Sequence, residues 1–598
     1  MVAPRRCIRV GNVSGATGDA PLAFARMVRE GDVDVITGDW LSEMNIAWNA
    51  IARAQDPATG YETGFLEQLS ECIEQVAVQG IKVITNAGAL NPRALSRELV
   101  VATVVGDDVS HFLSDDKSAS SALHWRHLDD DGVELADWDS ELRPTCAVAY
   151  MGAWGIVEAL AAGADIVVCG RVTDASPVLG AAAWWHGWSR SAYTSLAGSL
   201  VAGHIIECGP YAVGANYSGF KAHLAQLVDV GFPVAEIAAD GSFVVTKPPS
   251  MNGVVGRLNI IAQLLYELQG ELYLNPDVTA DLSDVAVEET GINNRVRVSG
   301  AQGMPPPATT KVMVAAPGGY QAETTYYING LDIEAKACMM EAQVRHALRG
   351  NRFSKLSVEL YGRQDATVSP RSQQQGTAML RVFAQARRRQ DIAADQFRVP
   401  MYSLRMQSYP GYHMNLDFRS MDPRPFMELF PGVLPLDQLD HRVLIPHLNL
   451  DIPIPPSPKT AQYPTQRCSY ETAEPVPLES FGPTVKVPLG AIVHARSGDK
   501  ANNSNVGFFV RAQDEYPWLQ SFLTVDRLRL LLEDDYKGQR IERVEFPRVW
   551  AVHFRIMDFL DGGIASSSRI DGLGKGVGEY LRSKHVQIPV KFLDRGWI

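Results

Sequence analysis

The stretch 151–174, MGAWGIVEALAAGADIVVCGRVTD, holds one complete unit of the pattern that decides the fold. Residues 151–162 have helical composition, and Gly163 supplies the left-handed residue that ends a helix. Residues 165–169 form a short apolar strand, and a polar loop follows it. Strands of continuous apolar residues are typical of a parallel sheet with helices on both faces. The same order of helix, glycine, strand and polar loop also occurs at 22–38 and 65–88.

This repeat predicts an α/β fold, with a doubly wound, mostly parallel sheet in an N-terminal domain at residues 1–445. A TIM barrel shares the local pattern and is the alternative. Nine prolines occur between Pro446 and Pro483, which predicts a linker at 446–484. The strand-like and helical segments after it predict a small α+β, ferredoxin-like domain at 485–598.

Composition narrows the classes of partner. A net charge of −13 over 598 residues argues against nucleic acid, because phosphate binding needs clustered Lys and Arg. No apolar run reaches the roughly 18 residues of a membrane span, and no secretory signal is readable. The seven cysteines are dispersed, which fits a reducing compartment. We therefore expect a cytoplasmic homo-oligomer without nucleic-acid or membrane partners.

The loops after the strands are the expected ligand site, because ligands bind at the C-terminal ends of parallel strands. After the first strand, the glycine-rich stretch 11–19 could offer N–H groups to an anion, with Asp19 binding substrate or simply capping a helix. After the third, Asn91 and Pro92 suit a helix start, so Arg93 beside it suggests an anionic ligand. A surface Arg93 is the alternative.

Four side chains from these loops and the following helix are predicted to be catalytic. Asp174 would act as acid or base, while Arg171 clamps a substrate carboxylate; a buried ion pair between the two is the alternative. His204 and Glu207 lie three residues apart, and His is the natural proton shuttle near pH 7, although a structural His is the alternative. Asn86, with Asn91, would donate to a developing enolate oxygen.

The polar stretch 494–505 is the densest polar cluster of the second domain. It carries His494, Arg496, Asp499 and Lys500, a mixture suited to binding an anion beside a proton donor. We predict that this stretch is a loop facing the 86–93 and 171–174 loops and completing the substrate site; a solvated loop is the alternative. No cluster of metal ligands and no nucleotide fingerprint occurs, so neither a metal nor a redox cofactor is expected.

Four stretches resemble the signatures of the acyclic terpene utilisation (AtuA-like) family. They are NAGALNPRA from Asn86, AYMGAWGIVEALAAGADIVVCGRVTDAS from Ala149, GHIIECG from Gly203 and HARSGDKANNSN from His494. The resemblance implies a large N-terminal domain with a ferredoxin-like C-terminal domain. It also implies a role in bacterial breakdown of branched acyclic terpenoids through CoA thioesters. One departure is Ala501-Asn502, where the family commonly has Gly and an acidic residue.

Together these observations predict an enzyme, a lyase or hydratase acting on a branched carboxylate or acyl-CoA. Proton transfer and enolate stabilisation would be its chemistry, with the coenzyme A thioester as substrate rather than cofactor. A non-catalytic scaffold or partner subunit is one alternative. An NAD(P)-linked oxidoreductase is another, which the missing GxGxxG disfavours.

Overall fold

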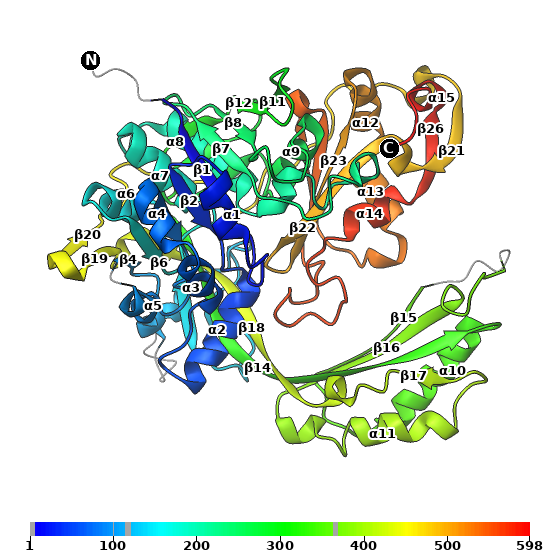
Figure 1. The fold of residues 1–598 in the computed structure, drawn as a ribbon. Helices are drawn as coiled ribbons and strands as arrows, with labels where there is room; N and C mark the ends of the chain where they lie inside the picture. The colour runs from blue at the N-terminus through cyan, green and yellow to red at the C-terminus, as the bar shows by residue number, and fades with distance from the viewer. Residues whose placement is uncertain (1–5, 100, 114–120, 363–368) are drawn as a thin grey trace.

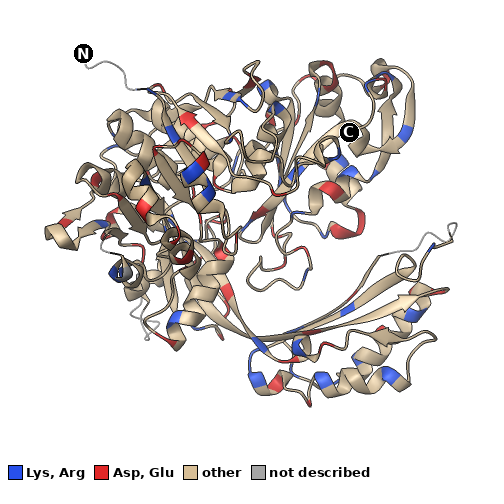
Figure 2. Ribbon diagram, in the orientation of Figure 1, with Lys and Arg blue, Asp and Glu red and all other residues tan. Residues whose placement is uncertain are grey.

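The computed structural model describes residues 6–99, 101–113, 121–362 and 369–598. An N-terminal α/β body, a lobe that projects from it and a C-terminal domain are visible in Figure 1. Acidic and basic residues are interspersed over all three parts (Figure 2). Within the described ranges, no helix is both long enough and apolar enough to cross a membrane.

The body is built on one eleven-stranded sheet with a parallel centre. The parallel strands, in spatial order, are β1 (Ile8–Asn12), β2 (Val35–Gly38), β3 (Lys82–Thr85), β6 (Ile166–Cys169) and β4 (Ala102–Val105). Antiparallel strands extend both sides: β7 (Val234–Ile237), β8 (Phe243–Thr246), β12 (Val296–Ser299) and β11 (Ala286–Glu289) beyond β1, and β19 (Arg442–Ile445) and β20 (Leu450–Pro453) beyond β4.

The predicted doubly wound, mostly parallel sheet is therefore a mixed sheet. The repeated unit in the sequence describes its centre, where helices connect successive strands. On one flank, the connection between β7 and β8 is too short for a crossover: only residues 238–242 join these strands, with Gly241 at a φ of 88°. Such a short turn permits only antiparallel pairing.

Helices cover both faces of the parallel centre. Successive residues of one strand enter opposite cores: Val167 and Cys169 of β6 pack in one core, and Val168 packs in the other. One face is covered by α6 (Trp154–Ala161), α7 (Ser176–His186), α8 (Tyr193–Ile206) and α9 (Arg257–Leu265), and the other by α1 (Ala23–Glu30), α3 (Thr63–Ser70), α4 (Ile73–Gln79) and α5 (Pro92–Glu98). Helix α2 (Glu43–Gln55) follows β2.

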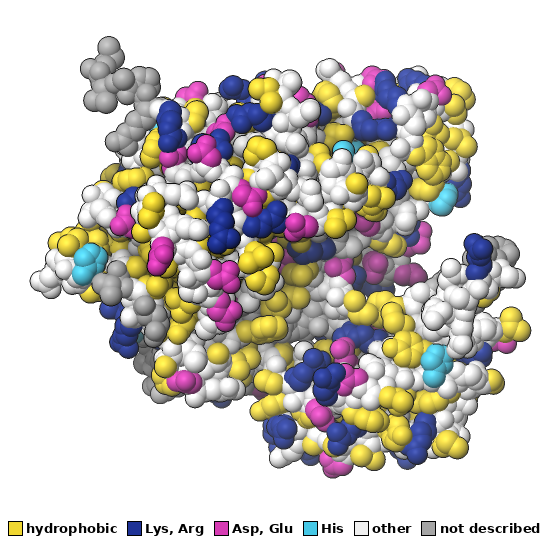
Figure 3. Space-filling view, in the orientation of Figure 1, with side chains coloured by type: hydrophobic (Ala, Val, Ile, Leu, Met, Phe, Trp, Pro, Cys, Tyr) yellow, Lys and Arg dark blue, Asp and Glu magenta, His cyan; other side chains and the backbone are white. Residues whose placement is uncertain are grey.

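A single strand, β14 (Thr309–Asn329), leads out of the body into the lobe. Its first half pairs with β5 (Cys146–Ala149) and β18 (Arg424–Pro435), and its second half with β16 (Thr377–Ala386). The lobe, comprising the described residues of 320–425, also contains β15 (Lys355–Tyr361), β17 (His413–Met414), α10 (Ile333–Ala347) and α11 (Arg398–Ser403), with a core of its own. A hollow opens between the lobe and the C-terminal domain (Figure 3), while Gln385 of β16 still donates to the carbonyl of Ser566 at 2.8 Å.

The C-terminal domain has an antiparallel sheet in the order β22-β23-β25-β24 and a separate β21–β26 pair. Its elements are β21 (Thr484–Pro488), β22 (Val493–Lys500), β23 (Asn503–Val510), α12 (Tyr516–Phe522), α13 (Val525–Leu532), β24 (Ile541–Phe546), β25 (Ala551–Ile556), α14 (Val577–Arg582), β26 (His585–Pro589) and α15 (Val590–Leu593). Between the two domains, the stretch predicted as a linker also contains β20, which pairs with β19 at the edge of the large sheet.

The predicted polar loop 494–505 is instead a β-hairpin. β22 and β23 pair from Val493↔Val510 to Lys500↔Asn503, and Ala501 turns the chain at a φ of 52°. Nearly all of its residues are buried, because the hairpin lies against the N-terminal domain. Only the loop conformation is corrected: the stretch does meet the N-terminal domain, as the distance of 3.7 Å between Lys500 and Asp174 shows, but its backbone is paired as two strands.

Two glycines allow this close approach. Gly507 faces Leu265, where an added Cβ would lie 2.7 Å from the Leu265 Cβ, and a Cβ at Gly498 would overlap the ring of Tyr266. Both glycines lie in extended strands, so they serve close packing rather than an unusual backbone. The end of α9 therefore seats directly on the hairpin.

Gly498→Ala is expected to destabilise the protein by about 2 kcal/mol, because the Tyr266 ring must move to admit a methyl group. Urea denaturation of the full chain should show the lower midpoint. Gly572→Ala is the matched control, since the nearest atom to its added Cβ would lie 3.3 Å away. Equal midpoints for the two variants would contradict the proposed close docking.

Candidate functional site

Polar side chains meet where β2, β3 and β6 end, at one edge of the parallel sheet. Asn86, directly after β3, is fully buried. Its Nδ2 donates to Asp39, which follows β2, and its Oδ1 accepts from the backbone N–H of Trp40 at 2.7 Å. Both ends of this amide are engaged by the protein. Asn86 therefore positions Asp39, and the predicted donation to a substrate oxygen is not seen in this geometry.

Arg171 follows β6 and is 3% exposed. Its guanidinium donates to the Asp174 carboxylate and to the carbonyl of Leu41, and its Cζ lies 4.1 Å from the centroid of the Tyr150 ring. The two sequence alternatives for this residue were a substrate clamp and a buried ion pair. The geometry is that of the ion pair, so Arg171 holds Asp174 in place.

Lys500 brings the C-terminal domain into this cluster. It ends β22, and its Nζ lies 2.6 Å from Glu267 Oε2 and 3.7 Å from Asp174 Oδ2. The next residue reinforces the contact: the N–H of Ala501 donates to Glu43 Oε2 at 3.1 Å, while the other oxygen of Glu43 binds Lys311. The site is therefore shared between the domains within a single chain.

The carboxyl groups of this cluster titrate very differently. Burial and the nearby Asp174 raise the pKa of Asp39 well above its usual range. Burial would also raise the pKa of Asp174, but the charges of Arg171 and Lys500 outweigh it and lower that pKa. The surroundings therefore favour the protonated form of Asp39 and the carboxylate form of Asp174. Burial would lower the pKa of Lys500, yet Glu267 and Asp174 raise it well above its usual value, so the ammonium persists.

His204 and Glu207, at the end of α8, form a second buried pair. His204 Nε2 lies 3.0 Å from the carbonyl oxygen of Leu264, so that nitrogen carries the proton and donates it. Its Nδ1 faces Glu207 Oε1 at 3.6 Å. Burial raises the pKa of Glu207 to about 7, despite the lowering effect of His204. Glu207 can thus gain and lose a proton near neutral pH.

Three predicted residues lie outside the cluster. Asp19 accepts the backbone N–H groups of Gly15 and Ala16, at 2.7 and 2.9 Å, so the loop meant for an anion is filled by its own carboxylate. Asn91 Nδ2 donates to the carbonyls of Pro57 and Thr59. Arg93 is exposed on α5, where its charge contributes to lowering the pKa of Asp451 at the sheet edge. The exposed Arg93 is thus not among the residues that meet at the sheet edge.

Of the remaining predicted hairpin residues, one packs in the core of the interface and two lie near the cluster. His494 stacks on Tyr217 and Phe509, and its Nδ1 lies 2.8 Å from Ser218 Oγ. Burial lowers the pKa of His494 to about 3, so it is neutral. Burial and Glu267 raise the pKa of Asp499 well above its usual range. Arg496 lies over two tyrosine rings, Tyr211 and Tyr266.

Several members of the cluster had no distinguishing signal in the sequence. Lys311 lies inside β14, and Glu267 follows α9 in a stretch that contains no motif. Only the folded structure, in which the hairpin lies against the sheet edge, identifies these two residues as members of the cluster. Glu43 had a weak signal, its four-residue spacing from Asp39 just after the second strand.

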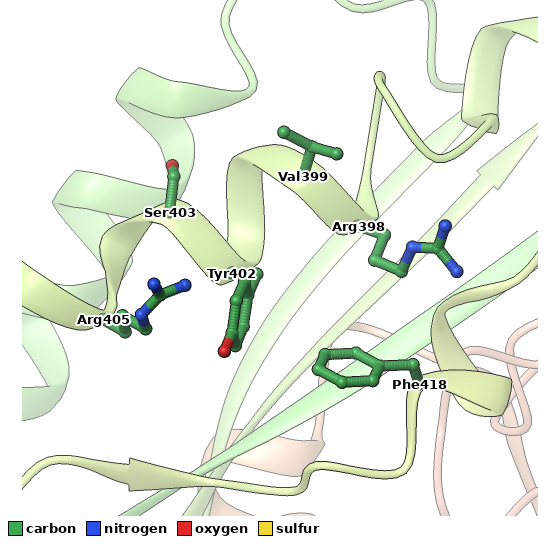
Figure 4. A pocket seen from close by; sticks show the side chains of 6 residues that line it. All are labelled: Arg398, Val399, Tyr402, Ser403, Arg405 and Phe418. Carbon is green, nitrogen blue, oxygen red and sulfur yellow. The ribbon is translucent and has the colours of Figure 1, made fainter.

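A separate pocket of about 390 Å³ lies in the lobe (Figure 4). Arg398, Val399, Tyr402, Ser403, Arg405 and Phe418 line it. This lining includes no carboxyl or imidazole group that could exchange a proton near neutral pH. The buried cluster at the sheet edge is therefore the better candidate for chemistry.

Arg171→Lys is expected to lower the stability of the folded chain by about 2 kcal/mol, because an ammonium cannot reach both Asp174 and the Leu41 carbonyl. Thermal denaturation measures the loss. Arg93→Lys makes the same change at an exposed helix position and should melt like the parent chain. A fully stable Arg171→Lys variant would show that the guanidinium is not a structural partner of Asp174.

Comparison with known families matches two parts of the chain. Residues 8–445 match the acyclic terpene utilisation family protein AtuA, and residues 487–587 match the AtuA ferredoxin-like domain. Searches of curated proteins and of solved structures give no significant match. The first match alone spans well over half of the chain, and the two follow one another in the order of the observed domains. The chain therefore belongs to the acyclic terpene utilisation (AtuA) family, with the large N-terminal domain and the ferredoxin-like C-terminal domain of that family.

Proposed function

We propose that the protein is an enzyme of acyclic terpenoid-type catabolism, a lyase or hydratase acting on a branched carboxylate or its CoA thioester. The observation that carries the proposal is the Glu207 carboxyl group, whose pKa of about 7 suits proton transfer at neutral pH. Its neighbours include Asp39, whose pKa is raised, and Asp174, whose pKa is lowered. Neighbouring carboxyls with separated pKa values are typical of acid–base sites.

Glu207 is assigned the general base, which removes the proton next to the substrate carbonyl. His204 supports it: its Nδ1 faces the carboxyl and orients it, while the Nε2–H is anchored on the Leu264 carbonyl. Removing this proton creates an enolate, whose negative oxygen needs a positive partner. Lys500 supplies a persistent ammonium from the second domain.

Asp39 is assigned the general acid. Its raised pKa favours the protonated carboxyl, and Asn86 fixes its orientation. A protonated carboxyl can deliver that proton to a departing hydroxyl group, as elimination of water requires. Asp174 remains ionised between Arg171 and Lys500, so it orients the ammonium rather than moving a proton.

The proposal predicts that the protein exchanges the α-protons of a branched acyl-CoA, or of its free acid, with solvent deuterium. NMR in D₂O detects this exchange even when the direction of the overall reaction is unknown. Glu207→Gln should slow exchange by at least about 100-fold, the typical contribution of a general base. The wild-type rate should rise as pH increases through about 7, because the base must be ionised.

Glu43→Gln is the matched control, since Glu43 binds Lys311 and the Ala501 N–H but has no assigned proton transfer. It should keep the same pH dependence. A wild-type protein that exchanges no α-proton in any branched thioester or acid would contradict the proposal and favour a scaffold role. A rate that stays flat from pH 6 to 8 would remove Glu207 from the base assignment.

A further inference from the structure

A second cluster at the domain junction contains two cations against the same pair of tyrosines. Arg496 of β22 is 3% exposed, and its Cζ lies 4.6 Å from the centroid of the Tyr211 ring and 4.1 Å from that of Tyr266. Lys575 Nζ donates to the hydroxyls of these tyrosines, at 3.2 and 2.9 Å. The cations come from the C-terminal domain and the tyrosines from the N-terminal domain.

One donor nitrogen of Arg496 is not satisfied by the protein. Its Nη2 is buried and has no hydrogen-bond partner among the described residues. Its contacts with the tyrosines are made over the ring faces, and they stabilise the charge without accepting a hydrogen bond. Leaving a buried guanidinium without an acceptor is costly unless another group supplies one.

The local charge balance is also positive. Within the described part of the chain, neither Arg496 nor Lys575 forms an ion pair with a carboxylate. Glu267, next to Tyr266, is already engaged by Lys500 at 2.6 Å. Asp499 is the other nearby acid, and its carboxyl is held towards the neutral form by burial and by Glu267. A buried guanidinium and a partly buried ammonium therefore lie against the same two rings, and neither is paired with a carboxylate.

We propose that Arg496, Lys575, Tyr211 and Tyr266 form a subsite that binds an oxyanion group of the ligand. A guanidinium, an ammonium and two hydroxyls are the donors that carboxylate and phosphate oxygens accept from. The inference deepens the proposed function and rests on it for the reacting end of the ligand. Arg496 and Lys500 share one face of β22, about 13 Å apart along the strand, so one strand connects the subsite to the carboxyl cluster.

The oxyanion can come from two sources, the free carboxylate of a branched acid or a phosphate of coenzyme A. Isothermal titration of the full-length protein at low ionic strength separates them, with 3-methylbutanoate, inorganic pyrophosphate and coenzyme A as the three probes. Binding of 3-methylbutanoate identifies the subsite as a carboxylate site. Binding of pyrophosphate and coenzyme A identifies it as a phosphate site.

Arg496→Gln and Lys575→Gln should each weaken binding of the recognised probe at least tenfold. Arg569→Gln is the matched control, because Arg569 makes a similar contact over the Phe559 ring, at 4.7 Å, in the same domain. It should bind like the wild type. Lys575 is only partly buried, so its variant tests the subsite even where Arg496→Gln fails to fold.

The subsite is overturned if the wild type binds none of the three probes, or if the folded variants bind as tightly as the wild type. These binding measurements do not depend on whether the protein catalyses a reaction. Probe binding that is lost in the variants, without any deuterium exchange by the wild type, retains the subsite and removes the proposed reaction. Deuterium exchange by the wild type, together with variants that bind the probes as tightly as the wild type, removes the subsite and retains the reaction.

Discussion

The seating of the β22–β23 hairpin on the end of α9 is the contact on which the site depends. Gly498 and Gly507 remove the side chains that would hold the surfaces apart, so Tyr266 and Leu265 pack against strand backbone. This contact places Lys500 beside Glu267 and Asp174 and lets the Ala501 N–H reach Glu43. Neither domain alone contains the complete set of charges.

The protonation pattern follows from that arrangement. Burial disfavours every charge, so each carboxyl remains ionised only where a cation compensates it. Asp174 has Arg171 and Lys500 on either side and remains charged, whereas Asp39 has a neutral amide as its closest partner and is pushed towards the protonated form. Glu207, facing an imidazole, lies between these extremes. One desolvated environment thus yields a base and an acid from the same type of side chain.

The sequence predicted the centre of the fold better than its periphery. The helix–glycine–strand unit identified the parallel strands and the edge where Asp39, Asn86 and Arg171 meet, because those features are local in the chain. The antiparallel flanks and the long strand β14 depend on pairing between distant segments, which no local pattern encodes. Arg93 was misplaced for a related reason: the direction in which a helix leaves its strand decides which side chains face the ligand edge.

The hairpin 493–510 is the segment whose observed structure differs most from the structure that its sequence pattern predicts. A polar stretch is normally solvated, yet this one is a buried pair of strands, with His494 and Arg496 covered by the other domain. Apolar residues of similar size would make such an interface at least as stable, since buried charges seldom repay their desolvation. Local rules of sequence tend to be broken where function requires it. The presence of Arg496 and Lys500 at this interface therefore fits the proposed site better than a purely stabilising role.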